Sequence, residues 1–202
     1  MGAMGISNGH GPGAGHGRRG PSSFWMQDEE AVFRELNLQD GNCFLDLGCG
    51  PGEYSMRAAA CVGNAGRVYA VDKWGRAIEE LSSRAREEGL TSIQTINADI
   101  TGPLPIPDRD VDVCLMATVL HIIRLSDQRK TLFEEIRRVL KPAGRLAVIE
   151  CKKEEWNFGP PVHIRLAPEE IESFVEEFGF IRQSYGDLGY NYIIQFVVMK
   201  KD

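Results

Sequence analysis

Three glycines at alternate positions follow a short apolar run in the first half of the chain, Phe44-Leu45-Asp46-Leu47-Gly48-Cys49-Gly50-Pro51-Gly52. Glycine adopts positive φ at little cost, and a ligand can lie against its backbone because it has no Cβ. A helix that begins at such a turn directs its free N–H groups at the same point. The pattern therefore predicts a ligand-binding turn between a strand and a helix, with a purely structural turn as the alternative.

Four carboxylates are expected near this turn, on Asp46, Glu53, Asp72 and Asp99. Asp72 lies about 20 residues beyond the glycines, where an acidic side chain at the end of a second strand can hold the hydroxyl pair of a ribose. The glycine spacing of the dinucleotide fingerprint, GxGxxG, is not met, and Glu53 stands where that fingerprint needs a small residue. Glu53 would also repel a pyrophosphate. The residues therefore favour a ligand that carries positive charge.

Alternating strands and helices must place these residues at one edge of a sheet. The expected strands are 44–47, 67–71, 92–97, 110–116 and 145–149, and the expected helices between them are 53–62, 75–88 and 127–140. This order is typical of an α/β fold, with a Rossmann-like, doubly wound, mostly parallel sheet and helices on both faces. Such sheets bind ligands outside the carboxyl ends of the strands, where the strand order reverses.

A helix at 168–178 and two strands at 180–184 and 191–199 are expected at the end of the chain. The connection at 186–189 is too short for a parallel crossover, so these two strands should form an antiparallel hairpin at one edge of the sheet. Residues 142–144, Pro-Ala-Gly, are expected to end the helix at 127–140, ahead of the fifth strand.

The length of 202 residues indicates one domain with a sizeable core, expected at 23–202. Residues 1–22 are rich in glycine, so we expect a flexible tail, whose residues 1–4 are interpreted as a cloning remnant. The tail contains His10 and His16, but two histidines in a flexible tract lack a third ligand and a rigid frame. We therefore expect no metal site.

Charge and composition limit the partners and the compartment. The net charge is -6, and no stripe of lysine or arginine is interleaved with aromatic residues, which argues against nucleic acid as a partner. The five cysteines are odd in number and form no CxxC pair, which favours reduced thiols in the cytoplasm. No apolar run approaches the roughly 20 residues needed to span a membrane. None of these features indicates an oligomeric state.

Residues 23–26, Ser-Phe-Trp-Met, form a sudden apolar patch ahead of a predicted helix at 27–36. One interpretation is that Phe24 and Trp25 pack on the main core. The other is that the segment closes as a lid over the ligand turn, because it precedes the first strand and can reach the carboxyl end of that strand.

Five segments, taken in order, resemble the successive motifs of class I S-adenosylmethionine-dependent methyltransferases of the small-molecule type. They are LDLGCGPGEYS (45–55), VYAVDKW (68–74), NADI (97–100), LPIPDRDVDVCLMATVLHII (104–123) and RVLKPAGRLAVIE (138–150). The resemblance implies S-adenosylmethionine as cofactor. It also implies transfer of the methyl group to a small-molecule acceptor by in-line displacement, with release of S-adenosylhomocysteine. Quinone-like and metalloid acceptors occur among similar proteins.

The resemblance further implies cofactor contacts for ten residues, Asp46, Gly48, Cys49, Gly50, Asp72, Lys73, Trp74, Asp99, Ile100 and Met116. The backbone of Gly48, Cys49 and Gly50 would lie against the methionine part of the cofactor. Asp46 would meet the amino group of the cofactor directly or through water, and the carbonyl of Met116 would lie near the same group.

The nucleoside part of the cofactor is assigned to residues after the second and third strands. Asp72 would accept both ribose hydroxyls, with Lys73 or Trp74 beside the adenine. Asp99, together with the amide of Ile100, would contact the adenine edge. An aspartate at a strand end is also a common helix cap, which is the structural alternative.

A catalytic base is needed only if the acceptor arrives protonated. The ionisable residues that could face the pocket are His121, Glu150, His163 and Tyr190. The sequence does not decide among them, and His121 is retained as the candidate for the catalytic residue. The alternative for His121, which lies between two apolar residues, is a packed helix position.

Proteins with other functions would share part of this pattern. A nicotinamide-dependent oxidoreductase would need the GxGxxG spacing. A catalytically silent cofactor-binding or scaffold protein would keep the glycine turn without turnover. An aminopropyl transferase has the same fold and a related cofactor, but it usually pairs acids after the fourth strand, where this chain has Met116-Ala117-Thr118-Val119.

Overall fold

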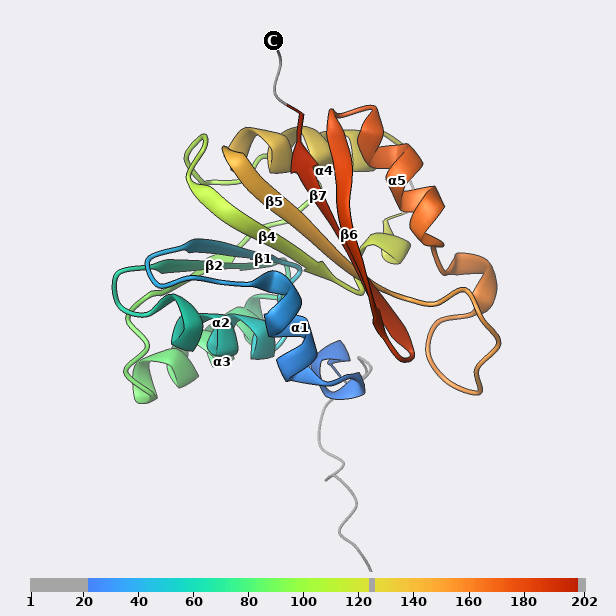
Figure 1. The fold of residues 1–202 in the computed structure, drawn as a ribbon. Helices are drawn as coiled ribbons and strands as arrows, with labels where there is room; N and C mark the ends of the chain where they lie inside the picture. The colour runs from blue at the N-terminus through green and yellow to red at the C-terminus, as the bar shows by residue number, and fades with distance from the viewer. Residues whose placement is uncertain (1–21, 124–125, 200–202) are drawn as a thin grey trace, which may run out of the picture.

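Seven strands form one sheet in the order β3-β2-β1-β4-β5-β7-β6 in the computed structural model (Figure 1). The structure describes residues 22–123 and 126–199. The strands are β1 (Cys43–Leu47), β2 (Arg67–Asp72), β3 (Ile93–Asn97), β4 (Val111–Ala117), β5 (Leu140–Cys151), β6 (Phe180–Leu188) and β7 (Asn191–Val198). Strands β1 to β5 are parallel, and β7 runs antiparallel between β5 and β6. The predicted Rossmann-like sheet with an antiparallel edge hairpin is confirmed, and its order reverses between β1 and β4.

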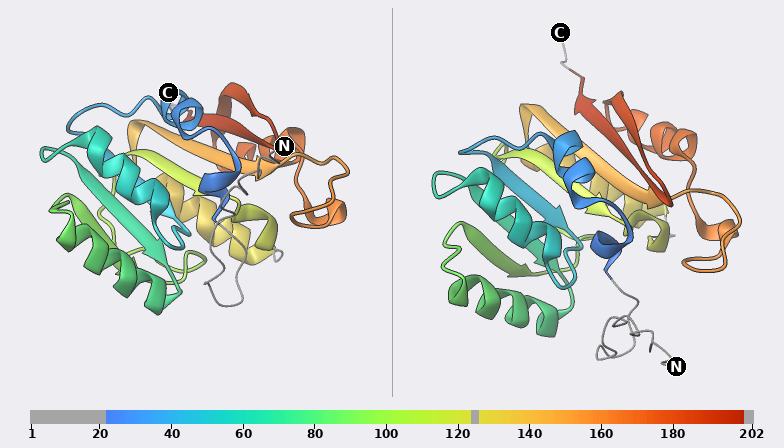
Figure 2. Two further views of the ribbon diagram at one scale, coloured as in Figure 1. Left: turned by 90° about the horizontal axis from the view of Figure 1, so that it is seen from below. Right: turned by 60° about the horizontal axis from the view of Figure 1, so that its bottom comes forward.

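Helices cover both faces of the sheet (Figures 1 and 2). The α-helices are α1 (Glu29–Leu36), α2 (Glu53–Val62), α3 (Gly75–Glu87), α4 (Ser126–Val139) and α5 (Pro168–Glu176). The short 3-10 helices are η1 (Ser23–Met26), η2 (Leu120–Ile122) and η3 (Val162–Ile164). Helices α1, α2 and α3 lie on one face, and α4 and α5 lie on the other (Figure 1). No helix in this part of the chain is long and apolar enough to cross a membrane.

The central strands are buried on both faces, as parallel strands covered by helices must be. All five residues of β1 are buried. On the α4 and α5 face the core includes Leu45, Met116, Phe133, Val148 and Ile171. On the other face α1 and α2 pack their apolar sides against strand residues such as Phe44, Leu115 and Ile149. The helices on both faces therefore fix the central strands, and with them the loops at the carboxyl ends of these strands.

Several element boundaries in the structure differ from the predicted ones. The first helix begins at Glu29 because Asp28 caps it, with the N–H of Glu30 donating to Asp28 Oδ1 at 3.0 Å. The helix expected at 127–140 does end before 142–144, at Val139. The fifth strand begins at Leu140 rather than at 145, and it includes residues 142–144 at a register shift against β4, where a bulge accommodates proline. Strand β6 continues to Leu188, so the hairpin connection is shorter than 186–189. The final helix ends at Glu176, before the predicted limit. Residues 1–21 of the expected tail lie outside the described residues.

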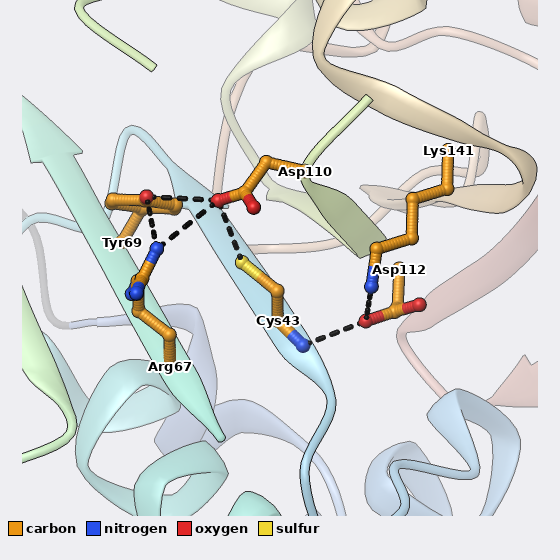
Figure 3. Close-up of polar contacts among 6 residues, drawn as sticks. All are labelled: Cys43, Arg67, Tyr69, Asp110, Asp112 and Lys141. Carbon is orange, nitrogen blue, oxygen red and sulfur yellow. Dashed lines mark hydrogen bonds and ion pairs between the residues drawn. The ribbon is translucent and has the colours of Figure 1, made fainter. Parts of the chain in front are cut away.

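A polar network joins the amino ends of β1, β2 and β4, opposite the glycine turn (Figure 3). Asp110 Oδ2 accepts hydrogen bonds from Tyr69 OH at 2.9 Å and from Arg67 Nη1 at 3.3 Å, and it lies 3.7 Å from Cys43 Sγ. Burial, together with the negative charge of Asp110, raises the pKa of Cys43 to about 12. The Cys43 thiol is therefore a neutral donor, and Asp110, which precedes β4, is the shared acceptor for donors from β1 and β2.

We expect Asp110→Ala to lower the free energy of unfolding by about 1 to 3 kcal/mol, because it leaves partly buried donors without a charged acceptor. Arg67→Ala, which removes the half-exposed ion pair and the hydrogen bond to Tyr69 OH, should cost less, about 0 to 1 kcal/mol. Urea denaturation of both variants tests this order. Equal losses would show that the network depends on the ion pair rather than on Asp110 as the shared acceptor.

Candidate functional site

The glycine turn joins β1 to α2 with positive φ at Gly48 (+76°), Gly50 (+52°) and Gly52 (+86°). A Cβ on Gly48 would lie 2.6 Å from a methyl carbon of Val119, and one on Gly52 would lie 2.5 Å from Leu81. A Cβ on Gly50 would meet no atom within 4 Å. Gly48 and Gly52 are therefore required by packing, whereas Gly50 borders open space in which a ligand can lie.

The first residues of the turn are fixed to β2. The N–H groups of Gly48 and Cys49 both donate to the carbonyl of Val71, at 2.8 and 3.1 Å. The Cys49 side chain is buried, and burial raises the pKa of its thiol well above the usual range, so it stays neutral. The backbone of these residues is thus held rigidly beneath the open space.

Asp72, at the end of β2, binds the turn directly. Its Oδ2 accepts from the N–H of Gly50 at 2.9 Å, and its Oδ1 accepts from the N–H of Trp74 at 2.8 Å. The side chain is buried, with 9% exposed. Each carboxylate oxygen has two lone pairs, so both oxygens keep capacity for a further donor. Asp72 is therefore both a structural link and an available acceptor.

Asp46 is buried within β1, beneath the start of α2. Ser55 Oγ donates to Asp46 Oδ2 at 2.6 Å, and the Ser55 backbone N–H also bonds this carboxylate. Burial raises the pKa of Asp46 to about 7, an effect that the charges of Asp72 and Glu53 add to and that the Ser55 bonds oppose. Asp46 is thus bonded to the first turn of α2 although Gly52 is the N-cap of this helix, and the charge of Asp46 is poised near neutral pH.

Glu53 contributes a carboxylate oxygen without a donor. Its Oε2 is buried and has no hydrogen-bond partner among the described residues. A buried oxygen in this state is costly unless a ligand or water satisfies it. Together with Asp46 and Asp72, it concentrates negative charge around the open side of Gly50. These residues fit a ligand that presents a cationic donor here.

The residues predicted for an adenine lie at the adjacent ends of β2 and β3. Asp99 Oδ1 accepts from Thr101 N at 3.0 Å and from Thr101 Oγ1 at 2.8 Å, and these bonds lower the pKa of Asp99. The Ile100 side chain belongs to the core. Lys73 is exposed, and Trp74 is half-buried. The structure thus brings the predicted group together, with Asp99 already capping a turn.

Strand β4 ends one residue beyond Met116, whose side chain is fully buried. The chain then bends at Thr118, which has φ of +54° and donates its N–H to the carbonyl of Ile149 at 2.7 Å. A β-branched residue in this conformation is strained. The bend places Val119 against Gly48 and begins η2.

His121, in η2, is paired with a fully buried carboxylate. Its Nδ1 lies 2.7 Å from Glu150 Oε2, and its backbone N–H donates to Glu150 Oε1 at 3.2 Å. The His121 side chain is 10% exposed and that of Glu150 is 0% exposed. The sequence missed this pair, although the available signal was that the two residues follow or end the neighbouring strands β4 and β5.

The other candidate bases do not join this pair. His163 is exposed in η3. Tyr190 OH donates to the carbonyl of Phe158 at 3.2 Å, and burial raises the pKa of Tyr190 to about 12. In the described part of the chain, no hydrogen bond links either residue to His121 or Glu150.

The apolar patch near the amino terminus is split by the structure. Phe24 is buried, and its ring centroid lies 5.0 Å from that of Tyr54. Trp25 is 72% exposed. Gln27 bridges Tyr54 OH and the Asn191 side chain. The packing interpretation is therefore confirmed for Phe24 and wrong for Trp25.

A loop at 152–167, which the sequence analysis did not assign to any element, extends beyond the sheet (Figures 1 and 2). Arg165 is buried, and its guanidinium donates to four loop carbonyls, of Lys152, Glu154, Phe158 and Pro160. Trp156 and Phe158 remain about half exposed beside a cavity of about 630 Å³. The buried guanidinium of Arg165 thus fixes the course of the loop directly after β5, which carries these two aromatic residues.

Comparisons with known proteins agree with this geometry. A family model described as a methyltransferase domain matches residues 44–144, half of the chain. A SAM-dependent methyltransferase from Aquifex aeolicus has a similar structure, with a TM-score of 0.80 and 30% sequence identity over 89% of this chain and 94% of that one.

Several curated relatives carry the names of quinone methyltransferases. Demethylmenaquinone methyltransferase of Geobacillus kaustophilus is 29% identical over 64% of this chain and 52% of that protein. The 2-phytyl-1,4-naphtoquinone methyltransferase of Nostoc punctiforme is 33% identical over 62% of this chain and 56% of that protein. The chain thus spans about half the length of the curated relatives it matches. From the matched domain and the shared sheet, the chain belongs to the methyltransferase domain family.

Proposed function

We propose that this chain transfers a methyl group from S-adenosylmethionine to a small-molecule acceptor. The observation that carries the proposal is the open space at Gly50, which is bordered by the carboxylates of Asp46, Glu53 and Asp72. When bound, S-adenosylmethionine supplies a methyl group on a cationic sulfonium, and its amino group is a second cation. The name of the Aquifex aeolicus relative supports this choice of cofactor.

The carboxylates near α2 suit the methionine part of the cofactor. In this proposal the unpaired oxygen of Glu53 and the carboxylate of Asp46 attract the amino group. The backbone of Gly48, Cys49 and Gly50 forms the floor of the site, and a side chain at Gly50 would enter the space that the ligand needs. The carbonyl of Met116, near the end of β4, faces the same part of the cofactor.

The end of β2 suits the nucleoside part. Asp72 accepts both ribose hydroxyls with the lone pairs that Gly50 and Trp74 do not use. The adenine lies beside Trp74 or Lys73, and its edge meets Asp99 and the amide of Ile100. Asp99 Oδ2 is the oxygen that Thr101 leaves available.

A nicotinamide cofactor is disfavoured by the same geometry. The buried, unpaired oxygen of Glu53 would face a pyrophosphate and repel it. A silent binding protein would share the cofactor site but would produce no S-adenosylhomocysteine. Mass spectrometry on a library of small molecules, incubated with methyl-labelled S-adenosylmethionine, separates turnover from binding alone. Binding with no labelled product from any acceptor would contradict the proposed activity.

The remaining features of the proposal concern the acceptor and its setting. We propose a small-molecule acceptor, with quinone-related compounds as the first to try, because the curated relatives are named for such compounds. Residues 23–202 act as one catalytic domain without nucleic acid as a partner. The five free thiols support a cytoplasmic location. Exposed Trp25 remains suited to a lid that closes over the acceptor.

We expect Asp72→Ala to weaken S-adenosylhomocysteine binding by tenfold or more. Each charge-assisted bond to a ribose hydroxyl is worth about 1.5 to 3 kcal/mol. Titration calorimetry measures the effect, and Asp110→Ala is the control, because it perturbs stability at the opposite end of the sheet. Unchanged affinity in Asp72→Ala would refute the ribose assignment.

Gly50→Val should abolish cofactor binding while the domain still unfolds cooperatively, because the new side chain enters the ligand space and meets no protein atom within 4 Å at its Cβ. The positive φ adds a modest cost in stability. Gly52→Val is the matched comparison and should damage folding itself, since its Cβ collides with Leu81. Thermal melts with and without S-adenosylhomocysteine distinguish the two. A ligand-induced shift retained in Gly50→Val would contradict the assignment.

Cofactor affinity should rise with pH and level off above about pH 7, the pKa to which burial raises Asp46. A neighbouring cation favours the ionised carboxylate, so binding releases the proton that Asp46 holds below this pH. The loss should approach tenfold per pH unit between pH 7 and 5.5. Adenosine, which lacks the amino group, should show no such slope, and neither should Asp46→Asn with the full cofactor. A slope that persists in Asp46→Asn would assign the proton elsewhere.

A further inference from the structure

The His121–Glu150 pair is built into the edge of the proposed methyl-transfer site. Thr118 ends β4 with a bend and bonds Ile149 of β5, Val119 contacts Gly48, and His121 then reaches Glu150. Residues 118–121 therefore connect the glycine turn to the end of β5. Strained backbone persists where the surrounding structure fixes it, and it is common at active sites.

The pairing sets the tautomer of His121. When Glu150 Oε2 accepts from Nδ1–H of a neutral imidazole, the lone pair of the ring lies on Nε2. The second bond, from the His121 backbone N–H to Glu150 Oε1, orients the carboxylate. A fully buried carboxylate that holds an imidazole in this way is the arrangement of an oriented general base.

Charged and titratable groups from the surrounding elements are few. Arg129 of α4 interacts electrostatically with Glu150 and with Glu170 of α5. Tyr192 of β7 lies near Glu150, and burial raises the pKa of Tyr192 far above neutral, so it carries no charge. Arg129 therefore supplies positive charge near Glu150, and His121 supplies a hydrogen-bonding partner.

We propose that His121 is the general base for this reaction, that Glu150 is its positioning residue, and that the acceptor carries a hydroxyl group on a conjugated ring. This inference rests on the proposed methyl transfer. A ring hydroxyl has a pKa near that of tyrosine, about 10, which places it within reach of a neutral imidazole. The half-exposed rings of Trp156 and Phe158, in the loop after β5, offer apolar surface for a planar acceptor.

The proposed reaction is a proton transfer followed by transfer of the methyl group. His121 Nε2 takes the proton from the acceptor hydroxyl, and an electron pair of the resulting ring oxyanion forms the bond to the methyl carbon. The carbon–sulfur bond breaks, and its electron pair remains on sulfur as a neutral thioether. His121 then returns its proton to solvent. Attack through oxygen gives a methyl ether. Attack through a ring carbon of the same anion gives a methylated dienone, whose ring C–H proton is then lost to solvent while the oxygen takes up a proton, which restores the aromatic ring.

The test uses methyl-labelled S-adenosylmethionine with 1,4-naphthohydroquinone, catechol and 2-naphthol as acceptors, kept free of oxygen. At pH 7 we expect His121→Asn to lower kcat by about 100-fold or more. Near pH 10, where the acceptor ionises without help, the ratio of wild-type to variant kcat should fall toward one. Glu150→Gln should lower kcat less and leave KM similar, because its amide oxygen still accepts from Nδ1. Glu134→Gln, an exposed carboxylate on α4, is the matched control and should match wild type.

Three other outcomes would contradict the inference or the proposed function on which it rests. If none of the three hydroxyl compounds is methylated although S-adenosylhomocysteine binds, the acceptor class is wrong. If His121→Asn is equally impaired at pH 7 and pH 10, His121 has a structural role and is not the base. If S-adenosylhomocysteine does not bind the wild-type chain at all, the proposed function fails before the inference is reached.

Discussion

The buried carboxylate of Asp72 holds the glycine turn in its working position. Its two oxygens accept from the backbone of Gly50 and Trp74, so one side chain fixes the loop after β1 to the loop after β2. Parallel pairing brings these loops to one edge of the sheet but does not set their separation. Charge-assisted bonds in a buried setting are stronger than bonds between neutral groups. The open space at Gly50, and each cofactor contact assigned around it, depends on this link.

The sheet was predictable because local patterns decide it. Apolar runs of strand length between helical repeats gave the strands, and the short connection before β7 required the antiparallel edge. The prediction failed at the start of the fifth strand, which was expected at 145, after a proline and a glycine, whereas β5 begins at Leu140 and continues across a register shift. A bulge of this kind depends on the partner strand, which no local pattern contains.

The sequence predicted which residues lie at the site, but it did not predict the hydrogen bonds that hold them. The motif order placed Asp46, Asp72 and Asp99 at neighbouring strand ends, as the structure shows. It did not reveal that Ser55 holds Asp46 or that Thr101 holds Asp99. His121 and Glu150 are 29 residues apart and meet only because β4 and β5 are adjacent. Hydrogen bonds between distant residues follow from the tertiary fold, and a single sequence carries no record of them.

The loop after β5 is held by one side chain whose hydrogen bonds in this loop go to backbone carbonyls. Arg165 donates to carbonyls at Lys152, Glu154, Phe158 and Pro160. Every amino acid offers a backbone carbonyl, so the residues of this loop can be exchanged while its course is preserved. Diversification could therefore alter the surface that meets an acceptor without disturbing the cofactor platform. A frame of this kind lets one scaffold acquire new substrates by small steps.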